Sequence, residues 1–116
     1  MSARIHVSAK QARTLDGIVF DSKAEMQRYA ELRMLERAGL IKDLELQPPY
    51  ILQDAYLRDG KKIRAITYFA DFRYLDMRTK RIVVEDCKGM QTEVYKLKKK
   101  ILLFKFPEIN FQEVKA

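Results

Sequence analysis

The sequence predicts a mixed α/β domain with a central sheet flanked by helices. Apolar residues recur first with the helical period, then with the strand period over the middle of the chain, and again with the helical period before a last short strand. The chain has 116 residues, a length typical of one domain, and its hydrophobic content of 47% is sufficient for a core. We therefore expect one folded unit over residues 14–116.

Residues 1–13 are expected to form a flexible basic arm. They show little periodicity and carry Arg4, Lys10 and Arg13. Such an arm either becomes ordered on a DNA backbone or serves as a solubilising tail, and the sequence leaves both readings open. His6, the single histidine, also lies here. We therefore expect neither a histidine metal site nor a histidine general base.

The first helix is expected from Ser22 to Ala38. Asp16-Gly17 is a turn signal, Ser22 is a typical N-cap residue, and Gly39 is a typical residue to follow a helix. An apolar stripe follows one face of this helix. It consists of Tyr29, Leu32 and Leu35.

The middle of the chain alternates apolar and polar residues, which indicates strands. Turn signals divide it at Pro48-Pro49, at Asp59-Gly60 and over residues 76–80. The expected extended segments are 41–46, 50–57, 63–74 and 81–88.

A second helix is expected between Gly89 and Pro107. Thr92 is a plausible N-cap, and the helical period continues to Phe106. A short strand over residues 109–114 follows. The expected core-facing stripe of the helix is Val94, Leu97, Ile101 and Phe104.

Composition narrows the classes of function. The formal net charge is +7 and the pI is about 9.6, which favours a polyanionic partner, most commonly nucleic acid. There is no apolar run long enough to span a membrane and no signal-peptide-like start. The single cysteine, Cys87, excludes an intrachain disulfide and fits a reducing compartment. We therefore expect a cytoplasmic protein.

Three charged residues at strand ends indicate a metal-dependent reaction on a phosphate group. Asp71 follows one apolar segment, and Asp86 and Lys88 end the next. Because strand side chains alternate, Asp86 and Lys88 point to the same face. Folding the ribbon about residues 77–79 places Asp71 opposite either Glu85 or Asp86, and the sequence does not fix which.

If Asp71 faces Asp86, the two carboxylates repel each other unless a cation lies between them. Mg²⁺ prefers such hard oxygen ligands and stabilises charge on a transferring phosphate. Lys88 would then orient the attacking water or neutralise developing charge. The alternative is that both aspartates are surface charges and that Lys88 pairs with one of them.

The neighbours of Asp86 on the same strand receive other roles. Glu85 lies on the opposite face and is expected to point toward solvent or a partner. The side chain of Cys87 is expected to pack as a small apolar group. Its backbone carbonyl could coordinate the metal.

Two helical residues have more than one interpretation. Ser22 and Glu25 fit a capping box, yet Glu25 shares the stripe of Tyr29 and would point toward the sheet, so it is a cap, a site residue or both. Lys98 falls within the apolar stripe of the second helix. It either extends along the helix edge to solvent or meets an anion, which could be a site carboxylate or the scissile phosphate.

The outer side of the second helix is basic. Lys96, Lys99 and Lys100 are expected either to contact DNA phosphates or to form a solvated face. Thr92 and Tyr95 are polar enough to line a cleft beside the expected site.

The order of these motifs resembles the PD-(D/E)XK nuclease superfamily, and within it a family of small phage-encoded proteins. The resemblance covers about residues 14–106, although Ala70 stands where the superfamily name has proline. The motifs that carry it are Phe20-Asp21-Ser22-Lys23-Ala24-Glu25, Tyr68-Phe69-Ala70-Asp71-Phe72 and Glu85-Asp86-Cys87-Lys88-Gly89, followed by Thr92 and a lysine-rich helix.

The resemblance implies a restriction-endonuclease-like αβββαβ core and a Mg²⁺ ion, for which Mn²⁺ would substitute. Asp71 and Asp86 would bind the metal, Lys88 would assist the nucleophile, and Glu25 would complete the site. Lys98 is the best candidate for the additional helix-borne residue near the cleft.

Small basic members of the superfamily resemble Holliday-junction resolvases, which act as two-fold dimers. The resemblance therefore implies a homodimeric endonuclease for branched DNA, in the host-cell cytoplasm if the protein is phage-encoded. The alternatives are a nicking or duplex endonuclease in phage recombination or packaging, a DNA-binding module without cleavage, and a subunit that docks an acidic partner through its lysine-rich helix.

Overall fold

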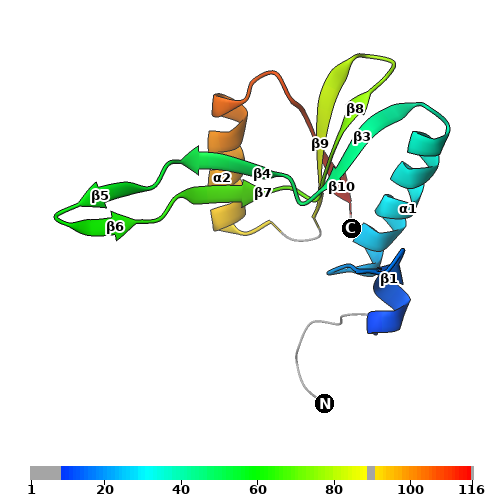
Figure 1. Cartoon of the computed structure of the whole chain (residues 1–116), viewed down its shortest axis with the longest axis horizontal. Helices are drawn as coiled ribbons and strands as arrows, with labels where there is room; N and C mark the ends of the chain where they lie inside the picture. Colours follow the sequence, from blue (N-terminus) through cyan, green and yellow to red (C-terminus); the bar gives the residue numbers. More distant parts are fainter. Residues whose placement is uncertain (1–8, 89–90, 116) are drawn as a thin grey trace.

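The computed structural model describes residues 9–88 and 91–115, which form two helices flanking a sheet, with a ribbon that extends to one side (Figure 1). The mixed α/β class is confirmed. The elements in chain order are η1 (Lys10–Arg13), β1 (Thr14–Leu15), β2 (Ile18–Val19), α1 (Lys23–Arg37), β3 (Ile41–Leu46), β4 (Pro49–Gln53), β5 (Tyr56–Arg58), β6 (Lys61–Ile63), β7 (Ile66–Phe69), β8 (Phe72–Asp76), β9 (Arg81–Lys88), α2 (Glu93–Lys105) and β10 (Asn110–Lys115).

The central sheet has the strand order β10-β9-β8-β3. Strands β3, β8 and β9 pair antiparallel, and β10 pairs parallel to β9. A parallel pair needs a long crossover, and α2 provides it. Strands β4 to β7 lie outside the central sheet. The elements that form this sheet and its helices follow the order α1, β3, β8, β9, α2, β10, which is the expected αβββαβ core.

Strands β3 and β8 leave the central sheet together at a bend. Beyond the bend they continue as the β4–β7 pair and then as the β5–β6 pair (Figure 1). Two backbone hydrogen bonds hold the bend, from Gln47 N to Asp71 O at 3.0 Å and from Ala70 N to Pro48 O at 3.2 Å. Gln47 has a φ of 53°, which is uncommon for a residue other than glycine. The single strand expected over residues 63–74 is therefore divided, and Asp71 lies at the bend.

Each helix covers its own core. Adjacent residues of β9 point to opposite faces, so Val83 packs on the α1 side and Val84 on the α2 side. The α1 core contains Phe20, Tyr29, Leu32, Ile41, Phe72, Tyr74 and Val83. The α2 core contains Tyr50, Leu52, Tyr68, Ala70, Val84, Tyr95, Leu102 and Ile109.

The predicted limits of α1 are confirmed. Ser22 Oγ accepts a hydrogen bond from the Glu25 backbone N–H at 3.1 Å, which satisfies one free donor of the first turn. Gly39, with a φ of 77°, follows the last turn in the left-handed region. The predicted apolar stripe packs against the sheet as expected.

The predicted core stripe of α2 is wrong. Val94, Leu97 and Phe104 are exposed, Phe104 by 85%, whereas Tyr95 and Leu102 are buried. Ile101 alone of the expected stripe packs partly against the core. Apolar residues with helical spacing lie on two faces of this helix. The face that packs against the sheet is the one with Tyr95 and Leu102, which also carries lysines.

The end of the expected flexible arm is structured. Lys10 and Arg13 lie in η1, and Arg13 Nη1 donates a hydrogen bond to Phe20 O at 2.6 Å. The predictions for Arg4 and His6 fall outside the described residues. No helix within residues 9–88 and 91–115 is long and apolar enough to cross a membrane.

Candidate functional site

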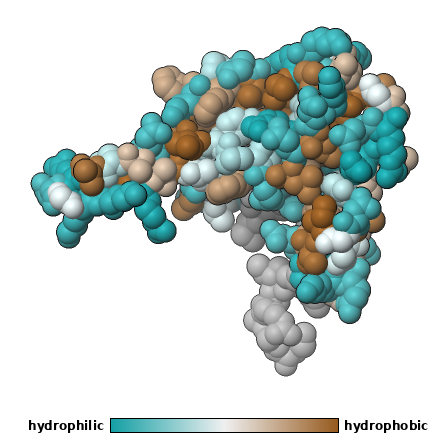
Figure 2. Space-filling view, viewed as in Figure 1, coloured by the Kyte–Doolittle hydropathy of each residue, from teal (hydrophilic) through white to brown (hydrophobic). Residues whose placement is uncertain are grey.

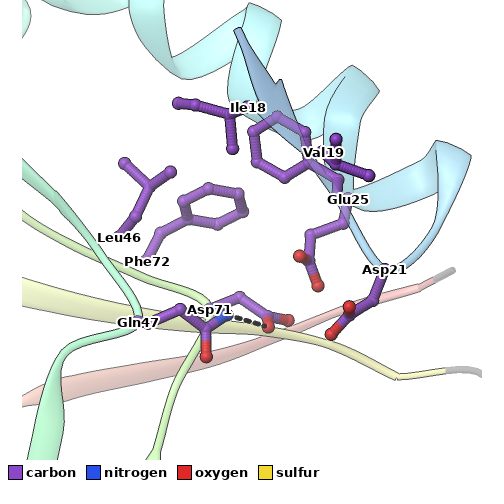
Figure 3. Close-up of a pocket in the computed structure, with 9 residues that line it drawn as sticks. Ile18, Val19, Asp21, Glu25, Leu46, Gln47, Asp71 and Phe72 are labelled. Carbon is purple, nitrogen blue, oxygen red and sulfur yellow. Dashed lines mark hydrogen bonds between the residues drawn. The ribbon is translucent and has the colours of Figure 1, made fainter. Parts of the chain in front are cut away.

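Three carboxylates meet where the N-terminus of α1 approaches the bend of the sheet. Asp21 precedes the helix, Glu25 lies in its first turn, and Asp71 lies between β7 and β8. Figure 3 shows the three carboxylates turned toward one another. They line a pocket of about 150 Å³ whose other walls are Ile18, Val19, Phe20, Leu46, Gln47 and Phe72.

The carboxylate of Asp71 is held by its surroundings. Its Oδ2 accepts a hydrogen bond from the backbone N–H of Cys87 at 2.6 Å, and Gln47 Nε2 lies 3.5 Å from its Oδ1. The N–H of Asp71 donates to Glu85 O at 3.0 Å. Asp71 is therefore tied to β9 by both its main chain and its side chain.

Glu25 faces Asp71 from the helix. The residue is 8% exposed, and its carboxyl group is turned toward that of Asp71 (Figure 3). Burial, followed by the nearby charge of Asp71, raises the pKa of Glu25 from 4.5 to about 8. The charges of Asp21 and Asp86 act in the same direction. These surroundings therefore favour the protonated form of Glu25.

Glu25 belongs both to the helix cap and to the candidate site, two roles that the sequence left open. Its backbone N–H is capped by Ser22, while its carboxyl group is directed at the sheet.

The register places Asp71 beside Asp86. Phe72 pairs with Glu85 across β8 and β9, so the preceding residue, Asp71, lies next to Asp86. Asp86 is 2% exposed and accepts a hydrogen bond from the hydroxyl of Tyr68. Burial and this contact raise the pKa of Tyr68. Asp71 and Asp86 are thus neighbours whose side chains accept from different donors.

The pKa of the Cys87 thiol is raised by its surroundings. Burial raises the pKa of its thiol to about 12, with further contributions from Asp71, Glu25, Glu85 and Asp86. The side chain packs against the α1 core, as expected for a small apolar group. Coordination of a metal by its carbonyl stays a prediction.

The donor set suits a hard cation. The Glu25–Asp71 pair offers carboxylate oxygens that repel each other once deprotonated, and a divalent ion would relieve this repulsion. Among residues 9–88 and 91–115, however, no three His, Cys, Asp or Glu side chains are arranged as a metal-binding group. Mg²⁺ commonly takes one or two protein carboxylates and completes its coordination with water and phosphate. The pair therefore fits Mg²⁺ but not a metal enclosed by protein ligands.

The expectation for Glu85 is wrong. It is 1% exposed, and Arg28 of α1 binds it through two hydrogen bonds, Nε to Oε1 at 2.7 Å and Nη2 to Oε2 at 2.6 Å. The hydroxyl of Tyr74 donates to the same carboxylate. Because α1 covers this face of β9, Glu85 points into the α1 core rather than toward solvent.

Of the two candidate lysines, Lys98 has a described side chain and Lys88 does not. Lys88 ends β9, and its side chain lies outside the described part of the chain. Lys98 Nζ donates to the backbone carbonyl of Thr67 on β7 at 3.3 Å. This contact places its ammonium group against β7, and it does not join Lys98 to the Glu25–Asp71 pair.

The comparisons with known proteins give one match. Residues 5–116 match the family described as "Protein of unknown function (DUF1064)". The chain belongs to the DUF1064 family. No curated protein and no solved structure matches it.

The lysine-rich face of this DUF1064 chain is only partly free. Lys96 and Lys100 are exposed on α2. Lys99 Nζ pairs with Glu113 Oε1 at 3.0 Å and lies over the ring of Phe111. Tyr95 is buried and donates from its hydroxyl to Glu113 at 2.5 Å, while Thr92 caps the helix.

Sequence reasoning missed three residues of the candidate site. They are Asp21, which lines the pocket, Gln47, whose amide faces Asp71, and Tyr68, which binds Asp86. A signal existed for Asp21, because it lies four residues before Glu25 and just ahead of the N-cap. Gln47 and Tyr68 reach the site only through the bend.

Proposed function

We propose that this protein is a Mg²⁺-dependent endonuclease that hydrolyses DNA phosphodiester bonds and prefers branched DNA such as four-way junctions. The observation that carries the proposal is that Glu25 and Asp71 face each other beside Asp21 in one pocket. A buried carboxyl group placed against another carboxyl group is costly for folding, and such an arrangement is typical of sites that bind cations or move protons.

In this proposal, Asp71 and Glu25 bind the metal and Lys88 acts on the phosphate. The N–H of Cys87 fixes Asp71, and Gln47 lies beside its other oxygen, so that Asp71 and Glu25 would hold the metal at the pocket. A divalent ion at this place supplies charge stabilisation on the phosphate and lowers the pKa of a bound water. Asp86 adds negative charge close by, and Lys88, two residues further along β9, is assigned to the developing charge on the phosphate.

The net charge of +7 supports DNA as the substrate. Branched DNA and a homodimer rest on the resemblance to junction resolvases. A nicking or duplex endonuclease uses the same site, and only the substrate distinguishes it.

A second candidate is a DNA-binding module without cleavage. Two observations favour it: Asp86 is engaged by Tyr68, and the described residues contain no three-ligand metal group. It predicts DNA affinity that is independent of metal.

The test is a cleavage assay with Mg²⁺ or Mn²⁺ on a four-way junction, a flap, a linear duplex and a single strand. We expect cleavage by the wild type, and a loss of at least about 100-fold in Asp71→Asn and Lys88→Ala. Asp43→Asn is the matched control, because Asp43 is exposed on β3 and its positive φ suits asparagine.

Calorimetry with Mg²⁺ completes the test. Binding that is lost in Asp71→Asn and kept in Asp43→Asn supports the nuclease, provided that both variants melt like the wild type. Cleavage that is equal in the wild type and Lys88→Ala would refute the assigned site. DNA binding without metal binding or cleavage would establish the second candidate.

A further inference from the structure

The hairpin at the far end of the ribbon stands clear of both cores. We define the distal hairpin as residues 56–63, which comprise β5, β6 and the turn between them. In Figure 1 it projects beyond α2, and Figure 2 shows this projection as largely hydrophilic with separate hydrophobic residues along it. Its residues are exposed except Ile63, which is partly buried.

The hairpin is well formed despite its exposure. Asp59 and Gly60 have φ values of 49° and 77°, and a two-residue turn with two positive φ angles matches the twist of paired strands. Tyr56 pairs with Ile63, and Arg58 pairs with Lys61. Local geometry therefore maintains an element that has little core of its own.

The charges of the distal hairpin favour a polyanion. Arg58 and Lys61 lie directly opposite each other, an arrangement that is unfavourable between like charges in a plain sheet. The one carboxylate at this end, Asp59, lies 3.7 Å from Arg58 with both side chains largely exposed, so it offsets little of the repulsion. Lys62 and Arg64, the residue that follows the hairpin, add two further exposed cations.

The apolar residues of the hairpin are consistent with the same ligand. Leu57 is 74% exposed and pairs with Lys62, and Tyr56 is 48% exposed beside Arg58. Apolar and aromatic side chains next to cations can contact the sugars and bases of a nucleic acid while the cations contact phosphates.

From these features we propose that the distal hairpin is a DNA-binding arm that lies along a groove of the duplex next to the candidate site. This inference rests on DNA being the ligand of the proposed nuclease. The major groove, about 12 Å wide, admits a two-stranded β-ribbon.

The connection to the site sets the reach of the arm. Gly60 precedes Asp71 by eleven positions in the chain. At about 3.3 Å per position the connection spans no more than about 36 Å, which is close to one turn of duplex DNA. The arm would therefore contact the duplex within about ten base pairs of the bond at the pocket.

The test measures DNA binding without cleavage, by fluorescence anisotropy in EDTA over a range of salt concentrations. The arm variant combines Arg58→Gln, Lys61→Gln and Lys62→Gln. The control removes the same charge from the opposite end of the molecule, with Arg37→Gln, Lys42→Gln and Arg78→Gln, all at exposed positions.

We expect the arm variant to bind at least about tenfold more weakly, with a log–log salt slope smaller by about 2 to 3 because about 0.9 is lost per phosphate contact. The control should keep the wild-type slope. Wild-type affinity should rise as the duplex is extended to about ten base pairs from the branch point, and the arm variant should lose this dependence.

Equal affinity and slope in the arm variant and the control would overturn the proposal, and so would DNA binding by the wild type that does not respond to salt. Because the assay contains no metal, its outcome is separate from that of the cleavage assay. A loss of binding in the arm variant together with an absence of cleavage would keep the arm and remove the nuclease.

Discussion

The buried carboxyl group of Glu25, which faces Asp71, predicts that Glu25→Gln makes the stability of the protein less dependent on pH. Glu25 is 8% exposed and faces Asp71, and its pKa is raised from 4.5 to about 8. Glutamine has nearly the same shape as protonated glutamic acid and does not titrate. The substitution therefore removes the titration and keeps the packing.

The sign follows from proton binding. The folded protein holds the Glu25 proton more tightly than the unfolded chain, so this contribution is complete below pH 4.5 and is lost as the pH rises through about 8. The difference between the two pKa values corresponds to at most about 5 kcal/mol, at about 1.36 kcal/mol per pH unit. We expect the free energy of unfolding of the wild type to fall by several kcal/mol between pH 5 and pH 9.

The assay is urea denaturation followed by circular dichroism at pH 5, 7 and 9. Glu25→Gln should be more stable than the wild type at pH 9, and its free energy of unfolding should vary less over the range. Glu108→Gln, which makes the same change at an exposed position, should follow the wild type. Parallel curves for the wild type and Glu25→Gln would refute the reasoning.

Two further predictions concern packing. Arg28→Met leaves the Glu85 carboxylate buried without its ion-pair partner and should lower the free energy of unfolding by about 3–5 kcal/mol; a change below about 1 kcal/mol would show that Glu85 reaches solvent. Leu102→Ala should cost about 2–5 kcal/mol, and Phe104→Ala should change stability by less than about 0.5 kcal/mol, both measured by urea denaturation. Reversed magnitudes would restore the stripe predicted from the sequence.

Local signals in the sequence were sufficient for the elements that begin and end at capping or turn residues. Ser22 and Gly39 define α1, Thr92 and Pro107 enclose α2, and the strand over residues 81–88 has the limits expected from its apolar pattern. These signals act over a few residues, so one sequence contains them.

The bend in the ribbon was beyond sequence reasoning. Pro48-Pro49 indicated an interruption, but Ala70 and Asp71 give no comparable signal that the partner strand is interrupted at the same level. The paired hydrogen bonds between the two strands decide it, and they bring Gln47 to Asp71.

The sequence by itself determined the order of the elements, the excess of positive charge, and the presence of Asp86 and Lys88 near the end of one strand. Only the tertiary structure decided which stripe of α2 is buried, that Arg28 takes Glu85 into the α1 core, and that Glu25 meets Asp71. The physical reason is that periodicity orders side chains around each element, whereas the element packed against a face decides whether a charge on that face is buried, paired or left in solvent.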